Sequence, residues 1–185
     1  MLSVRRATLD DVEPMVAAYT AAWRSGFTYM FSAQVFEDER FDEMRRDECL
    51  ESAFDDGTDT FVADLSGRVV GYVVSRSVGT DCEIDDLWVH PTSWGRGVAA
   101  ALLARAEDDM RSRGGRSMTA WVPEDSPTAN RFLDKLGWRP TGRTDELEMY
   151  ADDNTLVEYV RQLESVDLTR GLPRPTSSLA PSPAR

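Results

Sequence analysis

Two closely spaced glycines, Gly95 and Gly97, mark the segment whose residue types are best suited to binding chemistry. They follow a short apolar segment, residues 87–89, and precede residues 98–103, which predict the start of an amphipathic helix. The first N–H groups of a helix have no partner inside it, and the helix dipole adds a partial positive charge there. Because glycine has no Cβ, a ligand can come close to the main chain at such a turn. The segment therefore predicts a binding site for a phosphate or a diphosphate.

The glycine turn by itself leaves a second interpretation open, a strand–helix corner that binds nothing. A loop for nucleoside triphosphates is excluded, because the pattern Gly-x-x-x-x-Gly-Lys-Ser/Thr is absent from the sequence. The flanking elements must therefore decide between a diphosphate site and an empty corner.

Those elements can be predicted from apolar runs and alternation for strands and from helical spacing for helices. The predicted strands are residues 2–7, 61–65, 69–78, 83–90, 117–122, 138–143 and 156–163. The predicted helices begin after Asp10 or Asp11, span residues 38–53, run from Gly97 to Gly114, and run from Pro127 to Gly137. Ser66 and Gly67 predict a two-residue hairpin turn between the second and third strands.

The order of these pieces resembles the GNAT superfamily of N-acetyltransferases. Residues 87–103 match its signature of a strand, V-x-P, G-x-G/A and a helix with two leucines. Residues 126–138 resemble its second motif, a helix that ends in a leucine, a glycine and an aromatic residue. Residues 60–75 resemble its central hairpin, and residues 4–24 resemble its first strand and helix. The resemblance covers residues 2–163 and favours the diphosphate site over the empty corner.

The resemblance implies an α/β fold with a mixed, mostly antiparallel, strongly twisted sheet and helices on both faces. One parallel pair of strands would surround the cofactor. Residues 1–164 would form one acetyltransferase domain. Residues 165–185 are rich in proline, serine and arginine without periodicity, which predicts a disordered tail.

The resemblance also implies that the donor is acetyl-CoA and that particular residues hold it. Main-chain amides around the glycine turn would surround the diphosphate: Trp94, Gly95, Arg96, Gly97, Val98, Ala99 and Ala100. Main-chain groups of Leu87, Trp88 and Val89 would bind the pantetheine arm, and one N–H would stabilise the thioester oxyanion.

Two positions in the predicted donor site depart from the family pattern. Trp94 stands where the family has Gln or Arg, so we expect Arg96 to supply more of the charge. Ser126 stands where the family commonly has an Asn that touches the arm of coenzyme A. A helix-capping role is the other interpretation of Ser126.

Acetyl transfer needs a neutral amine, and a carboxylate on the strand that lines the cleft can take the proton. Glu83 is the first candidate, because a Glu recurs at this position in the family. Asp85 has the same strand parity and is the second candidate, whereas Asp86 faces the other way unless a bulge intervenes.

The tyrosine with which the family often protonates the leaving thiolate is missing, because Leu133 stands in its place. Water, Tyr150 or Tyr159 could substitute, or the protein could be a weak catalyst. The resemblance thus implies an N-acetyltransferase that moves an acetyl group to a primary amine by direct attack. The alternative is an acyl-CoA-binding regulatory module with little or no turnover.

Composition limits the partners of the chain. The net charge of −12 over 185 residues argues against nucleic-acid binding. The sequence has no apolar run of the ~18 residues or more that a membrane helix needs, so we expect a cytoplasmic protein. Cys49 and Cys82 are isolated, which predicts neither a disulfide framework nor a metal site.

The acceptor is expected to be a small amine or a peptide N-terminus, and a homodimer is left open. Four aromatic residues lie where the family forms its acceptor wall, although core packing is the favoured interpretation for most of them: Trp23, Phe27, Tyr29 and Phe31.

Overall fold

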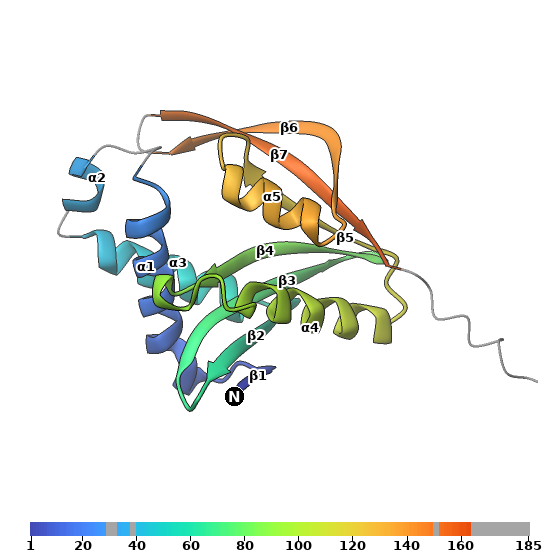
Figure 1. Cartoon of the computed structure of the whole chain (residues 1–185), viewed down its shortest axis with the longest axis horizontal. Helices are drawn as coiled ribbons and strands as arrows, with labels where there is room; N and C mark the ends of the chain where they lie inside the picture. Colours follow the sequence, from blue (N-terminus) through green and yellow to red (C-terminus); the bar gives the residue numbers. More distant parts are fainter. Residues whose placement is uncertain (29–32, 38–39, 150–151, 164–185) are drawn as a thin grey trace, which may run out of the picture.

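The computed structural model describes residues 1–28, 33–37, 40–149 and 152–163, and these residues form one mixed sheet with helices on both faces (Figure 1). In the described residues the sheet has seven strands in the order β1-β2-β3-β4-β5-β7-β6. Their bounds are β1 (Leu2–Arg6), β2 (Thr58–Leu65), β3 (Val69–Val78), β4 (Asp81–Val89), β5 (Ser117–Pro123), β6 (Arg139–Met149) and β7 (Asp152–Gln162). Strands β4 and β5 are parallel, and the other neighbours are antiparallel. The predicted fold class is confirmed.

The helices divide between the two faces of the sheet. Helices α4 (Val98–Ser112) and α5 (Pro127–Lys135) cover one face, and α1 (Val12–Gly26) and α3 (Phe41–Phe54) cover the other. The short helix α2 (Ala33–Glu37) precedes α3. Neighbouring residues of one strand supply both layers, because Phe61 packs under α4 and Val62 packs under α1 and α3.

Local signals explain the elements that frame the glycine turn. Helix α4 buries Val98, Leu102, Ala106 and Met110, which are spaced by four residues and so share one face.

The predicted β2–β3 hairpin turns through Ser66 and Gly67, with φ of 59° and 85°. Both residues thus adopt the left-handed backbone conformation that a tight two-residue turn requires.

Some predicted boundaries were too short. Strands β6 and β7 extend well beyond the predicted residues 138–143 and 156–163, and they pair with each other up to Met149 and Asp152. This added part carries acidic and other polar residues, so the apolar pattern did not reveal it. Helix α3 starts at Phe41, and residues 38–39 of its predicted span lie outside the described residues. The predicted tail, residues 165–185, lies outside them as well.

Candidate functional site

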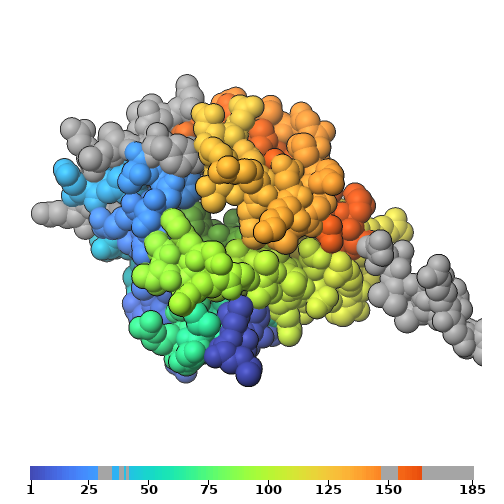
Figure 2. Space-filling model, in the orientation of Figure 1, coloured from blue at the N-terminus to red at the C-terminus, as the bar shows by residue number. Residues whose placement is uncertain are grey.

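Strands β4 and β5 diverge soon after they begin to pair. Their parallel ladder has three rungs, of which the last joins Ile84 and Ala120. Both strands continue, to Val89 and Pro123, without pairing to each other. Figure 2 shows an opening through the molecule between the start of α4, in green, and α5, in yellow-orange. The sheet therefore contains a gap lined by main chain that no neighbouring strand pairs.

The orientation of β4 at this gap follows from its pairing with β3. His90 N donates to Val70 O of β3 at 2.8 Å. Main-chain groups alternate between the two edges of a strand, so the N–H and C=O groups of Leu87 and Val89 face the gap. By the same alternation the main chain of Trp88 faces β3. Of the three predicted contributors, Leu87 and Val89 have main-chain groups placed to bind a ligand in the gap.

The glycine turn follows directly and exposes a row of main-chain donors. Gly95 and Gly97 have φ of 72° and 79°, and no atom lies within 4 Å of where a Cβ would stand on either. Helix α4 begins at Val98, and its first main-chain bond joins Ala101 N to Gly97 O at 3.0 Å. Within the described residues no protein group accepts from the N–H groups of residues 95–100.

These N–H groups sit at the N-terminus of a 15-residue helix, so the helix dipole reinforces them. Arg96 is exposed beside them and adds a positive charge. Such a cradle fits a diphosphate, since its oxygens can replace the missing acceptors.

A β-bulge in β4 positions the acidic residues. Val74 of β3 lies opposite Asp86, whereas the next residue, Ser75, lies opposite Ile84. Asp85 is therefore the extra residue, and the strand reverses its faces at this point. Leu87 and Val89 face α4, while Asp86 and Trp88 turn toward α1 and α3. Because this bulge interrupts the strand, Asp86 lies on the same face as Asp85, as expected for a bulged strand.

Glu83 is the carboxylate best placed to take a proton at the base of the gap. It forms a rung of the β4–β5 ladder opposite Thr119, next to the last rung. It is half-buried, and in the described part of the chain its carboxylate takes part in no hydrogen bond or ion pair. Burial raises the pKa of Glu83, and the negative charges of Asp85 and Glu158 raise it further. A carboxylate that is unpaired and has a raised pKa suits a general base.

Asp85, the second candidate, is already engaged. Its Oδ2 accepts from Arg76 Nε at 2.9 Å, and Arg76 also pairs with Asp55 at 3.0 Å. Burial raises the pKa of Asp85, while Arg76 acts to lower it. This ion-pair network makes Asp85 a residue that stabilises the bulge.

Asp86 was missed as a contributor to the site. It accepts hydrogen bonds from the Ser52 hydroxyl of α3 and from Trp88 Nε1, the latter at 2.6 Å. Burial raises the pKa of Asp86, and both hydrogen bonds oppose this. The signal was the adjacent pair of acids, Asp85 and Asp86, since a regular strand would bury one of them against α4.

An aromatic wall lies on the α1 side of β4. The ring of Trp88 lies 4.6 Å from that of Tyr19, 6.1 Å from that of Trp23 and 5.9 Å from that of Phe27, between ring centroids. Trp23 and Phe27 were predicted for this wall, and Tyr29 and Phe31 lie outside the described residues.

The α5 side of the gap offers few proton donors. Leu133 is buried in an apolar cluster with Trp138 and Tyr159. Burial raises the pKa of Tyr159, and Tyr150 lies outside the described residues. Ser126 Oγ accepts from Ala129 N at 3.4 Å, which is a helix cap.

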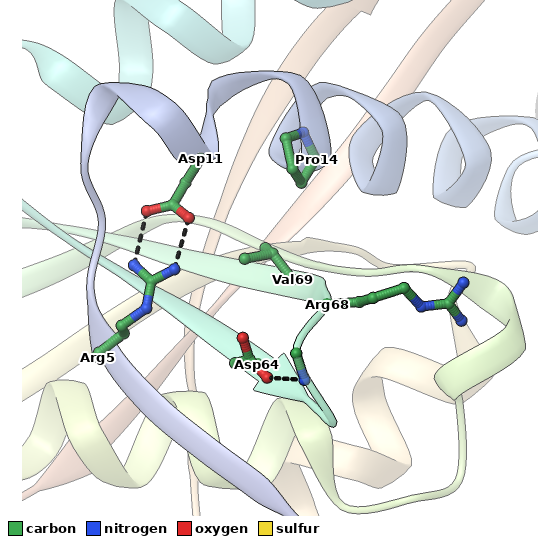
Figure 3. A pocket seen from close by; sticks show the side chains of 7 residues that line it. Arg5, Asp11, Pro14, Asp64, Arg68 and Val69 are labelled. Carbon is green, nitrogen blue, oxygen red and sulfur yellow. Dashed lines mark hydrogen bonds and ion pairs between the residues drawn. The ribbon is translucent and has the colours of Figure 1, made fainter.

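A second cavity, of about 360 Å³, lies far from the gap, near the N-terminus and the β2–β3 hairpin (Figure 3). Its charged groups are already satisfied. Arg5 and Asp11 form two hydrogen bonds of 2.7 Å, and Asp64 accepts from Gly67 N at 2.7 Å. Arg68 points away from them in Figure 3. We therefore assign no chemistry to this cavity.

Sequence comparisons place the chain among acetyltransferases. A family model described as Acetyltransferase (GNAT) family matches residues 16–138. An uncharacterized N-acetyltransferase of Methanocaldococcus jannaschii is 29% identical over 147 residues, which are 74% of this chain and 60% of that protein. An acetyltransferase of Photorhabdus laumondii is 37% identical over 75 residues, 40% of this chain and 52% of that protein. The chain thus spans between half and two thirds of these relatives.

Solved structures share the fold. The PaiA N-acetyltransferase from Thermoplasma acidophilum in complex with coenzyme A has a TM-score of 0.64 at 16% identity and covers 85% of this chain and 98% of its own. A GCN5-related N-acetyltransferase from Rhodopseudomonas palustris has a TM-score of 0.70 at 21% identity, with coverage of 87% and 95%. Among the described residues, no helix is both long and apolar enough to cross a membrane.

Proposed function

This chain belongs to the GNAT family of acetyltransferases, and from that premise we propose that it is an enzyme that transfers an acetyl group from acetyl-CoA to a primary amine. One observation carries the proposal. The unpaired N–H groups of residues 95–100 adjoin a gap whose β4 edge presents the main-chain groups of Leu87 and Val89. A diphosphate with an extended amide-containing arm, as in coenzyme A, matches both parts.

In the proposed reaction the amine nitrogen attacks the thioester carbon directly. The C–S bond breaks, and coenzyme A leaves as a thiolate that takes a proton from water. The N–H of Leu87 or Val89 donates to the carbonyl oxygen as negative charge develops on it. Glu83 takes the amine proton, directly or through a water molecule, and then releases it to the hydroxide that forms when water protonates the thiolate.

The two cysteines support direct attack over a covalent intermediate. Cys49 and Cys82 are 1% and 2% exposed, and burial raises the pKa of each thiol to about 11. At neutral pH both are protonated, and neither is accessible to a thioester.

We leave Ser126 out of the donor site, because its hydroxyl already caps α5.

The acceptor in this proposal is a small amine or a peptide N-terminus. Carboxylates at the base of the gap favour a cationic group, since Asp85 and Glu158 are close enough to Glu83 to raise its pKa. Arg143 and Arg76 offset part of this negative charge. The ribosomal-protein-S18-alanine N-acetyltransferase from Escherichia coli, a structural neighbour with a TM-score of 0.63, is named for a peptide acceptor.

A second function, an acyl-CoA-binding module without turnover, is favoured by the buried Leu133. A tyrosine there would have supplied the proton that the leaving thiolate needs. Release of free thiol from acetyl-CoA across a panel of amines and peptides distinguishes the two. Tight donor binding with no thiol release on any acceptor would establish the module.

The role of Glu83 is tested by Glu83→Gln, with Asp85→Asn as the matched control. The raised pKa of Glu83 keeps its inactive protonated form to higher pH, so wild-type kcat/KM should fall as pH drops through that pKa. We expect Glu83→Gln to lower kcat/KM at neutral pH by roughly 100-fold and to remove this acidic limb. Asp85→Asn should keep the limb, because Asp85 is paired with Arg76. An acidic limb that survives in Glu83→Gln would remove Glu83 from the role.

A further inference from the structure

Trp94 is an unusual residue at the entrance to the glycine turn. It stands immediately before Gly95, and it is 49% exposed despite its large apolar ring. The main-chain N–H of Trp94 donates to Pro91 O at 3.1 Å, so the backbone of Trp94 is fixed by the short helical turn Pro91–Ser93. The edge of its ring lies near the end of α1, because a Cβ on Gly26 would be 3.9 Å from Cη2 of Trp94.

The indole N–H of Trp94 is hydrogen-bonded to a main-chain carbonyl of β4. Its Nε1 donates to Val89 O at 2.6 Å. Val89 is the last residue of β4, and its carbonyl points toward the gap, since the adjacent His90 N–H is bonded to β3. The side chain thus covers the open edge of β4 between the gap and the glycine turn.

We propose that Trp94 sets the affinity for the acyl donor by competing with the pantetheine arm for the carbonyl of Val89. This inference rests on the proposed function, in which the arm runs along β4 from the gap to the diphosphate cradle. An arm on that path must cross the volume next to Val89 O that the indole fills. Its amide N–H and the indole N–H then compete for the same acceptor.

The displacement of the indole is feasible, because half of the side chain already faces solvent. The indole N–H can exchange its bond to Val89 for one to water. The net free energy of such a bond is small but measurable, and it opposes donor binding. A ligand that fills the diphosphate cradle without an arm does not meet this competition.

The test compares two ligands by calorimetry on the full chain: coenzyme A, and adenosine 3′-phosphate 5′-diphosphate, which keeps the diphosphate but lacks the arm. Trp94→Phe keeps an aromatic ring but removes the N–H. It should bind coenzyme A roughly three- to tenfold more tightly than wild type and bind the armless diphosphate equally well. Trp94→Ala, which also frees the volume, should tighten coenzyme A binding at least as much. Trp138→Phe, which removes an indole N–H in the buried core under α5, is the matched control and should change neither affinity by more than about twofold.

A spectroscopic measurement follows the indole itself. In protein labelled with 5-fluorotryptophan, the resonance assigned to Trp94 by its loss in Trp94→Phe should shift on adding coenzyme A. It should move little with the armless diphosphate. Weaker or unchanged coenzyme A binding in Trp94→Phe overturns the competition while the proposed function stands. Absence of coenzyme A binding in wild type and all variants overturns the proposed function itself.

Discussion

Helices α4 and α5 cover the same face of the sheet and border the same gap, yet they begin in opposite ways (Figure 1). The start of α5 is satisfied by protein groups. Ser126 Oγ accepts from Ala129 N, and Pro127 has no N–H to satisfy. The start of α4 follows Gly97, which has a left-handed backbone and no side chain that could act as a cap.

The difference shows how one fold separates a structural helix end from a binding one. In both helices the N–H groups of the first turn have no partner within the helix, and both helices have a positive dipole end. A capping side chain at α5 lowers the free energy of the fold. Its absence at α4, where glycine replaces the usual Ser, Thr, Asp or Asn, keeps the same donors available for a ligand.

The largest predicted effect converts the start of α4 into a capped one. In Gly97→Asp the new carboxylate can cap α4, and it places a negative charge where the diphosphate is proposed to bind. Repulsion at this distance should raise the KM for acetyl-CoA by roughly 100-fold or more. The space at Gly97 is open, so the protein should still fold, with a loss of stability because the φ of 79° strains any residue other than glycine. Steady-state kinetics and a thermal melt test both statements.

Gly142→Asp is the matched control for Gly97→Asp. Gly142 also has a positive φ, 85°, with no atom within 4 Å of its Cβ position, but it lies in β6 away from the turn. Its substitution brings the same backbone strain and the same charge, and KM should be unchanged. A similar rise in KM for both variants would show that the effect is not local to the cradle.

The 3-10 turn Leu9–Asp11, which precedes α1, offers a third kind of helix start, in which an ion pair is built into the capping box. Asp11 accepts from Thr8 N at 2.8 Å and from both terminal nitrogens of Arg5, so its pKa falls to about 2. A lowered pKa stabilises the fold above the ordinary carboxyl pKa, and this stability is lost as pH falls toward about 2. Asp11→Asn should therefore lower the free energy of unfolding at pH ~7 by about 2 kcal/mol.

Urea denaturation of wild type and Asp11→Asn as a function of pH checks this sign. The difference between the two proteins should shrink below pH ~4 and nearly vanish near pH ~2, where the wild-type carboxyl becomes protonated. Donor KM should stay the same, since Asp11 is at the far edge of the sheet from the gap. A stability difference that persists at the lowest pH would assign the effect to packing instead of charge.

The contrast between helix starts was largely predictable from sequence, because caps are local. Ser126-Pro127 predicts a capped helix, and Gly95 and Gly97 predict an uncapped turn, each from a few adjacent residues. The buried face of α4 followed from the spacing of its apolar residues. Such signals depend on neighbours in the chain, so they survive without knowledge of the tertiary structure.

The gap and its acids depend on distant pairing, which a single sequence does not encode locally. The bulge at Asp85 exists because β3 sets the register of β4, and Asp86 acquires its partner Ser52 from a helix 34 residues earlier. The contact between Trp94 and Val89 also needs the geometry of the turn. Each feature arises where two segments meet in space, so the type of chemistry was predictable and its exact residues were only partly so.

The smallest predicted effect removes the cap of α5 and makes its start resemble that of α4. Ser126→Ala leaves Ala129 N–H without its acceptor, which should lower the free energy of unfolding by about 0.5–1 kcal/mol. Because this hydrogen bond is long, at 3.4 Å, we expect the loss in the free energy of unfolding to lie at the lower end of that range. Thr128→Ala is the matched control, since it removes an exposed hydroxyl from the same turn without removing a cap, and it should not destabilise the protein. Urea midpoints measure the difference. If Ser126→Ala instead keeps its stability and raises the KM for acetyl-CoA, the hydroxyl belongs to the donor site, and the two helix starts share one ligand.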